Sequence, residues 1–146
     1  MRFEIEREAH AENLQGIRDF IETACRGAGV ERSAGVDLKL AVDEACSNIL
    51  EHGYAGRRPG PIRIRFDAEG DQVVVTITDR GRAFDPKDAV VPDLDADWEH
   101  RRVGGLGWHL IRRSVDSVSY ESDPNAGNRL TLVKMTPLAK ASTGSE

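Results

Sequence analysis

The amino-acid sequence predicts an α+β protein, a two-layer sandwich in which about three helices cover one face of a mixed, mostly antiparallel sheet. Segments with the two-residue periodicity of strands fall into hairpin pairs, and segments with helical periodicity are grouped between them. The 146 residues correspond to one domain, which is long enough to bury a core without disulfides.

The first elements are expected to be a strand and a helix. Residues 2–6 alternate between apolar and charged side chains, which is typical of a strand. Apolar residues spaced by three and four then predict a helix over about 10–28, and Gly27 and Gly29 are expected to end it.

The later part of the chain is expected to contain four strands, a long connection and another helix. The strands are expected at 62–66, 73–78, 117–121 and 129–135, and the helix from near Gly105 to about Val115. Residues 80–103 are polar and acidic, and such a long connection in a compact domain is typical of a lid. We expect one domain over 1–137 and a frayed tail over 138–146.

The composition argues against several classes of function. A net charge of −5 gives no sign of the basic face that binding to nucleic acid requires. Neither a membrane span nor the apolar core of a signal peptide is present in the sequence, so we expect a cytoplasmic protein without a membrane partner. Cys25 and Cys46 fall in apolar helical patterns and are expected to be buried thiols.

A second helix, over about 33–53 with Ser33 as its N-cap, carries polar residues beside its apolar face. Glu44, Asn48 and His52 are spaced by four and lie on one stripe, because each step turns only about 40° around the helix. A carboxylate and a carboxamide at the rim of a core are costly without partners. The stripe alone fits either a functional site or an ordinary solvated boundary.

Two further segments contain glycines next to groups that could bind a ligand. Asp79 ends a predicted strand, where its carboxylate can accept a hydrogen bond from an exocyclic amine, and Gly81 lets a ligand ring approach the backbone. Gly104, Gly105 and Gly107 precede a helical pattern, and glycines at a helix N-terminus present N–H groups to an anion. Taken alone, each segment also fits a plain turn or a hinge.

In this order, the three segments resemble the motifs of the GHKL ATPases (gyrase, heat-shock chaperone, histidine kinase, MutL). DLKLAVDEACSNILEHGY is similar to the N box, DRGRAF to the D-x-G-x-x-F box, and VGGLGWHLI to the glycine box that anchors the ATP lid. The short chain, the H-G-Y ending of the N box and the GGLG spacing most resemble the anti-sigma-factor serine kinases. The resemblance covers roughly residues 10–135 and implies the Bergerat fold of these ATPases.

This resemblance implies a site for ATP and Mg²⁺. Glu44 would be the general base, Asn48 the magnesium ligand, and Asp79 the adenine contact. The other implied ATP-binding residues are Gly81, Ala83, Phe84, Gly104, Gly105, Leu106 and Gly107. As a hypothesis, Arg101 and Arg102 are the cations of the acidic lid.

The family further implies a protein-serine kinase that phosphorylates a STAS-type anti-anti-sigma partner and otherwise sequesters a sigma factor or similar regulator, usually as a homodimer. One alternative is a non-catalytic nucleotide-binding module that only sequesters a regulator. Another is the detached ATP domain of a histidine kinase, which the sequence disfavours because none of its four histidines lies on a preceding dimerisation helix.

Two positions depart from the family pattern, and one histidine matches it without a clear role. Trp108 stands where an aliphatic residue is more usual in the family, and Asn128 stands where we expect a threonine after the glycine. His52 matches the N-box pattern, but as a single helical histidine it is expected to be structural.

Overall fold

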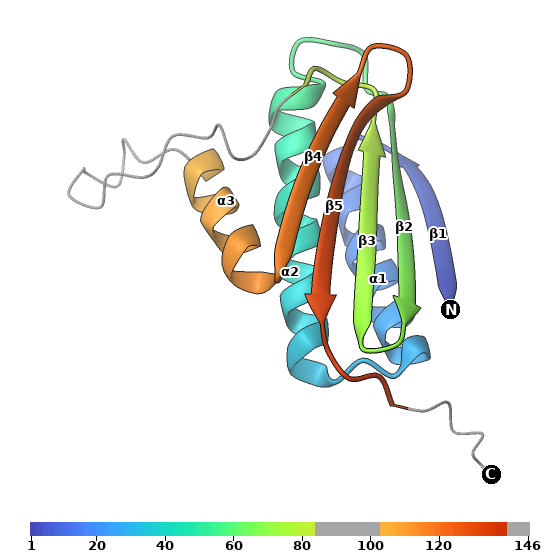
Figure 1. The fold of residues 1–146 in the computed structure, drawn as a ribbon. Coiled ribbons are helices and arrows are strands. Elements are labelled where there is room, and N and C mark those ends of the chain that lie inside the picture. The colour runs from blue at the N-terminus through green and yellow to red at the C-terminus, as the bar shows by residue number, and fades with distance from the viewer. Residues whose placement is uncertain (84–102, 140–146) are drawn as a thin grey trace.

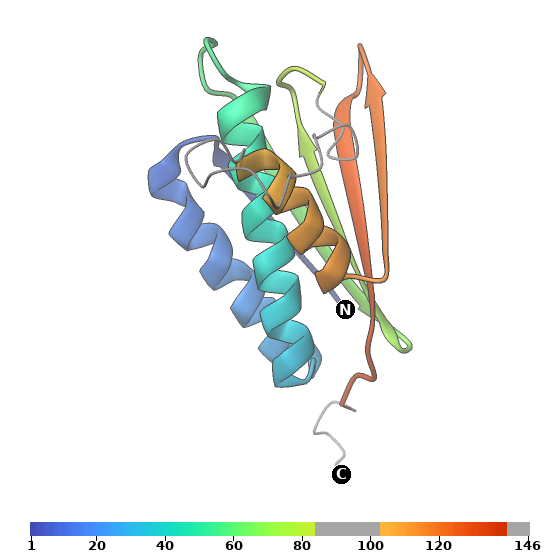
Figure 2. The same ribbon diagram turned by 90° about the vertical axis from the view of Figure 1, so that its left-hand side faces the viewer.

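Residues 1–83 and 103–139 are described by the computed structural model, and they form two layers (Figures 1 and 2). Three helices lie against one face of a sheet of five strands, and the other face is open. In chain order the elements are β1 (Arg2–Glu8), α1 (Leu14–Ala28), α2 (Arg32–Asn48), β2 (Pro61–Glu69), β3 (Gln72–Asp79), α3 (Val103–Ser114), β4 (Ser117–Asp123) and β5 (Gly127–Met135). The predicted fold class is confirmed.

The strand order of the sheet is β1-β2-β3-β5-β4, and every pairing between these strands is antiparallel. The sheet is therefore simpler than the mixed one that we expected. β3 and β4 do run parallel, because both pair antiparallel with β5, but β5 lies between them. The parallel strands joined by the α3 crossover are thus not neighbours.

The core lies between the two layers. β2 alternates between buried and more exposed residues, as the sequence predicted, and β3 shows the same alternation. The largest fully buried side chains in the described part of the chain are Phe66, Ile17, Ile21, Leu38, Ile62, Ile64, Ile77, Ile111, Leu132, Val42, Val73 and Val75. They come from both layers, so burial of one apolar face on each holds the sandwich together.

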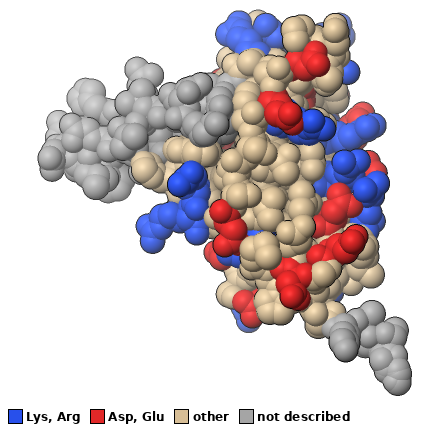
Figure 3. Space-filling view, in the orientation of Figure 1, with Lys and Arg blue, Asp and Glu red and all other residues tan. Residues whose placement is uncertain are grey.

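The open face of the sheet has an uncharged central band with charged side chains around it (Figure 3). Opposite charges pair across neighbouring strands at its margins. Arg63 Nε lies 3.3 Å from Glu6 Oε1, and Arg129 Nη2 lies 2.8 Å from Glu121 Oε1. An antiparallel sheet with one solvated face is expected to have this polar character.

The predicted end of α1 and the predicted start of α2 both differ from the structure. Gly29, with φ of 76°, ends α1, whereas Gly27 lies inside the helix. Ser33 is not the N-cap of α2, because Glu31 has the extended dihedrals of that position and its carbonyl accepts the Gly35 N–H at 3.0 Å. The Ser33 hydroxyl instead donates to Glu31 Oε1 at 2.8 Å.

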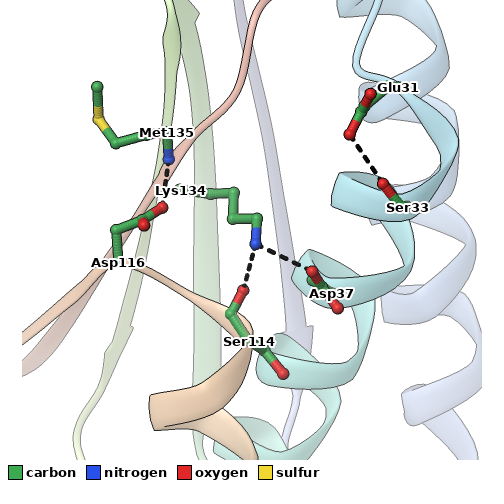
Figure 4. Close-up of polar contacts among 7 residues, drawn as sticks. All are labelled: Glu31, Ser33, Asp37, Ser114, Asp116, Lys134 and Met135. Carbon is green, nitrogen blue, oxygen red and sulfur yellow. Dashed lines mark hydrogen bonds and ion pairs between the residues drawn. The ribbon is translucent and has the colours of Figure 1, made fainter.

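The C-terminal end of α3 is fastened to both layers (Figure 4). Lys134 of β5 donates from Nζ to Asp37 Oδ2 of α2 at 2.9 Å and to the Ser114 carbonyl at 3.0 Å. Next to it, the Met135 N–H donates to Asp116 Oδ2 at 2.6 Å. The end of α3 therefore lies beside the first turns of α2, and Lys134 supplies a positive charge at a helix C-terminus.

The structure also bears on the predictions for the cysteines, the C-terminal tail and a membrane span. Cys25 and Cys46 are buried free thiols, and burial raises the pKa of Cys25 to about 11. Leu138 forms a bridge with Val30, so the chain is held at that point. Residues 140–146, and residues 84–102 of the lid predicted over 80–103, lie outside the described residues. None of the helices in the described part is long and apolar enough to cross a membrane.

Candidate functional site

The end of β3 places Asp79 directly opposite Asn128 of β5, and both are more than nine-tenths buried. Asp79 Oδ1 accepts hydrogen bonds from the Gly81 N–H at 2.8 Å and from Asn128 Nδ2 at 2.9 Å. Asn128 Nδ2 also lies 2.9 Å from the Gly81 carbonyl, and its Oδ1 accepts the Ser122 hydroxyl at 2.7 Å. The carboxylate is fixed through Oδ1, which leaves Oδ2 to accept a hydrogen bond from a ligand.

Two opposing effects act on the charge of Asp79. Burial raises the pKa of this carboxyl, and the hydrogen bonds from Asn128 and Gly81 oppose that rise without cancelling it. A donor from a bound ligand would favour the charged form, because it replaces part of the water that burial removes.

A π-helical turn, Ile49–Gly53, continues α2 and brings its backbone against the segment after β3. The Gly53 carbonyl accepts the Arg82 N–H at 2.7 Å. A Cβ on Gly81 would lie 2.5 Å from that same carbonyl oxygen. Gly81 is therefore required by a contact between two backbone segments, whereas we had expected it to make room for a ligand ring. π turns are frequent at functional sites.

Tyr54 joins the same two segments. Its hydroxyl accepts the Arg80 N–H at 2.8 Å and donates to the Pro61 carbonyl at 2.9 Å. Sequence reasoning missed Tyr54 and Gly53, and it treated Asn128 only as a departure from the family. The available signal was the H-G-Y ending of the N box. Asn128 lies beside Asp79 through the pairing of β3 with β5, which are not consecutive strands, so no local signal pointed to that contact.

Glu44 and Asn48 lie on α2 one helical turn apart, as predicted. Asn48 is 5% exposed, and its buried Nδ2 has no hydrogen-bond partner among the described residues. A Cβ on Gly107 would lie 2.8 Å from Glu44 Oε2 and 3.8 Å from both polar atoms of the Asn48 side chain. The structure therefore brings the third glycine of the glycine box onto the polar stripe of α2.

The environment of Glu44 favours its protonated form. Burial raises the pKa of this half-buried carboxyl, and the negative charges of Asp43 and Glu51 raise it further. A carboxylate with a raised pKa is a better proton acceptor than one on an open surface.

The remaining predicted site residues lie in different parts of the molecule, and some lie outside the described residues. Gly104, Gly105 and Leu106 lie in the first turn of α3, where backbone N–H groups have no helical partner. Gly107 is the fifth residue of that helix, and the absence of a Cβ leaves space beside Glu44. Ala83 is exposed. Phe84, Arg101 and Arg102 lie outside the described residues.

His52 and Trp108 are both half-buried. His52 lies in the π turn, next to the contact with the segment after β3. Trp108 packs against the hydrophobic core, and the Arg112 guanidinium lies 5.7 Å from its ring centre. Trp108 thus helps to seat α3 on the core.

A small pocket joins the two parts of the site, because both Asn48 and Asp79 line it. Its wall also includes Ala45, Ile49, Gly53, Arg82, Tyr120 and Leu130. Apolar walls with a few polar groups are typical of a site for a small molecule. The space inside it is about 20 Å³, enough for a water molecule but far too small for a purine. The walls must therefore separate to admit a purine ring.

The donor set fits magnesium only as part of a nucleotide complex. The described residues contain no group of three or more His, Cys, Asp or Glu side chains that could hold a metal ion. Mg²⁺ in nucleotide sites commonly uses one or two protein ligands together with phosphate oxygens and water. The buried, unpartnered carboxamide of Asn48 fits that arrangement.

This combination of fold and site defines an ATP-binding domain of the GHKL type: an antiparallel sheet, an asparagine on the middle helix, and an aspartate with a glycine after the central strand. The model of the histidine kinase-like ATPase domain matches residues 7–134. The chain belongs to this family, which confirms the resemblance seen in its sequence.

The named relatives of the chain are serine-protein kinases and anti-sigma factors. The chain is similar to the serine-protein kinase RsbW of Listeria monocytogenes, with 36% identity over 100 residues, which are 66% of this chain and 64% of the relative. It is 29% identical over 98 residues to the anti-sigma F factor of Clostridium beijerinckii, covering 67% and 68% of the two chains. The chain thus spans somewhat under two thirds of the length of the Listeria relative.

The fold also matches the solved structure of the RsbU and RsbW domains of a Mycobacterium tuberculosis protein. The TM-score is 0.68 at 19% identity, and the match covers 95% of this chain and 33% of the other. At this identity the likeness supports the fold.

Proposed function

We propose that this chain is an ATP-dependent protein-serine kinase and anti-sigma factor of a partner-switching module. Its substrate would be a serine of a STAS-type anti-anti-sigma protein, and it would otherwise sequester a sigma factor or similar regulator. We further propose that it acts in the cytoplasm as a homodimer. The names of its relatives, RsbW kinase and anti-sigma F factor, support this function.

The observation that carries the proposal is the pairing of Glu44 with Asn48. A carboxylate with a raised pKa lies one helical turn from a buried carboxamide that has no partner in the described part of the chain. Neither arrangement benefits the fold by itself, because the buried amide of Asn48 lacks a partner and partial burial disfavours the charge of Glu44. Together they suit a bound phosphoryl donor and an incoming hydroxyl.

In the proposed reaction the serine Oγ attacks the γ-phosphorus of ATP. The Oγ–P bond forms, the bond from that phosphorus to the β–γ bridging oxygen breaks, and ADP leaves. Glu44 takes the proton of the serine hydroxyl. Asn48 would hold Mg²⁺, which supplies charge neutralisation on the phosphates when bound. Asp79 would accept the adenine amino group, and the N–H groups at the start of α3 would face the phosphates.

The test is phosphate transfer from labelled ATP in the presence of Mg²⁺ to the purified STAS-domain proteins of the source organism. We expect phosphoserine on one of them by mass spectrometry. Glu44→Gln should keep ADP affinity and lose about 10²–10⁴-fold in rate, as expected for removal of a general base. Tight binding of a sigma factor without any transfer would instead select the non-catalytic alternative.

A further inference from the structure

Three of the five large, exposed apolar side chains in the described part of the chain belong to the helical layer. Val36 and Leu40 of α2 are 54% and 37% exposed, and Leu110 of α3 is 37% exposed. We call these three residues the α2–α3 patch. Exposed apolar residues that gather on one face mark interaction sites more often than scattered ones do.

The patch is continuous with the proposed catalytic residues along α2. Val36, Leu40, Glu44 and Asn48 are spaced by four, so they form one ridge on the helix. Exposure decreases along this ridge, from the exposed Val36 and Leu40 through the half-buried Glu44 to the buried Asn48. A molecule that covers Leu40 therefore lies one helical turn from the proposed base.

Leu110 of α3 lies beside the same ridge of α2. α3 runs antiparallel to α2, since Gly107 meets Glu44 while Ser114 shares Lys134 with Asp37 (Figure 4). Leu110 lies one turn after Gly107, which places it level with the part of α2 that precedes Glu44. Because Trp108 packs toward the core, Leu110 lies on the outer side of α3.

The charged side chains beside the patch differ in whether they already have a partner. Two bordering carboxylates are already paired: Asp43 Oδ1 with Arg18 Nε at 2.7 Å, and Asp37 Oδ2 with Lys134 Nζ at 2.9 Å. Lys39 and Arg113 are also close in sequence to the patch, and within the described residues no ion pair engages either of them. The rim therefore offers unmatched positive charge to a partner.

We infer that the α2–α3 patch is the docking surface for the protein substrate, and that it takes a segment with an apolar stripe flanked by carboxylates. This inference rests on the proposed kinase function. Docking here would bring the acceptor serine to Glu44 from the outer side of the helical layer. Burial of the apolar stripe would supply affinity, and the cations of the rim would orient the segment.

The test uses the full chain and the STAS-domain protein that it phosphorylates. Leu40→Gln combined with Leu110→Gln should raise the KM for that protein about tenfold or more and leave kcat and the Kd for ADP unchanged. Met135→Gln is the matched control, because Met135 is 55% exposed on the open face of the sheet. An unchanged KM, or an equal rise in the control, would overturn the inference.

A charge-reversal pair tests the rim separately. Lys39→Glu combined with Arg113→Glu should raise the KM and weaken its dependence on salt, whereas the exposed Arg26→Glu on α1 should change neither. If the apolar double variant unfolds or loses ADP binding, Val36→Gln replaces it, since Val36 is the most exposed of the three patch residues. An unchanged KM in Val36→Gln would then count against the patch.

The outcome also separates this inference from the proposed function. If the wild-type chain phosphorylates none of the STAS-domain proteins, the kinase proposal fails. Direct binding of those proteins and of purified sigma factors then decides on the patch. Binding that the Leu40→Gln and Leu110→Gln pair abolishes and Met135→Gln preserves would retain the surface, whereas unaffected binding, or no binding at all, would reject it.

Discussion

The two ends of the site are built in different ways. At the Asp79 end, the carboxylate, Asn128 and the backbone of Gly81 bond to one another, and Tyr54 ties the adjoining segments together. At the Glu44 end, Asn48 has an unpartnered buried amide and Glu44 has a raised pKa. The first end is organised by the fold itself, whereas the second leaves polar groups to be satisfied by a ligand.

Because of this difference, we expect the two ends to contribute differently to the stability of the fold and to the rate of phosphate transfer. Variants that break the internal contacts at the Asp79 end should alter both the fold and nucleotide affinity, because the same contacts serve both. Variants at the Glu44 end should alter the rate of transfer while the fold stays intact or gains stability.

Gly81→Ala should have the largest effect, at the Asp79 end. The new Cβ would lie 2.5 Å from the Gly53 carbonyl oxygen, and neither backbone segment can move without loss of the Arg82 N–H bond. We expect a loss of about 1–3 kcal/mol or more in the free energy of unfolding, together with weaker ADP binding. Urea unfolding and calorimetry measure the two effects.

Gly16→Ala is the control, since no atom lies within 4 Å of its Cβ position. It should be neutral or stabilise α1 by up to about 1 kcal/mol. Equal stability of the two variants would show that the contact between Gly81 and Gly53 does not constrain the fold.

Asp79→Asn should separate affinity from stability within the Asp79 end. An asparagine can keep an oxygen at the position of Oδ1 and accept both internal hydrogen bonds, but it presents an NH₂ group to the ligand. Loss of a hydrogen bond to a charged group costs about 1.5–3 kcal/mol, so we expect ADP to bind about 10–100-fold more weakly. Titration calorimetry checks this.

The same variant should not lose stability at neutral pH. Folding raises the pKa of Asp79, so the folded state binds its proton more tightly than the unfolded chain does. Stability from this group therefore falls as the pH rises through the interval up to the folded pKa, and asparagine removes that loss. A clear drop in Tm at pH 7, with no drop in the exposed Asp71→Asn, would contradict this.

Gly107→Ala should act at the Glu44 end on rate alone. Its Cβ would lie 2.8 Å from Glu44 Oε2, the movable end of a side chain, so Glu44 can turn away at little cost to the fold. We expect the free energy of unfolding to change by less than about 1 kcal/mol, and the rate of phosphate transfer to fall about tenfold or more from misplacement of the base. An unchanged rate would show that Glu44 does not need its present position.

The pH dependence of the rate should change least. Glu44 must lose its proton to act as a base, so kcat/KM should fall as the pH decreases through its raised pKa. Glu51→Gln removes one of the carboxylates that raise this pKa and should move the profile slightly toward lower pH. A profile that is identical in Glu51→Gln, or flat across the acidic range, would argue against Glu44 as the base.

Much of this protein could be predicted from local patterns. The alternation of residues in β2, the β-branched run of β3, and the spacing of four between Glu44 and Asn48 depend only on neighbours along the chain. The predictions that failed, Ser33 as N-cap and Gly27 as helix end, concern helix ends. There, Gly29 and Glu31 compete with nearby residues of similar propensity, and a single sequence does not rank them.

The sequence by itself determined the elements, the family and the polar stripe of α2, because periodicity and motif order are local properties. Only the tertiary structure decided why particular glycines are needed and which residues meet. Gly81 makes room for Gly53, Gly107 for Glu44, and Asn128 fixes Asp79. These contacts join residues far apart in the chain, and they depend on how the two layers pack, which no local pattern encodes.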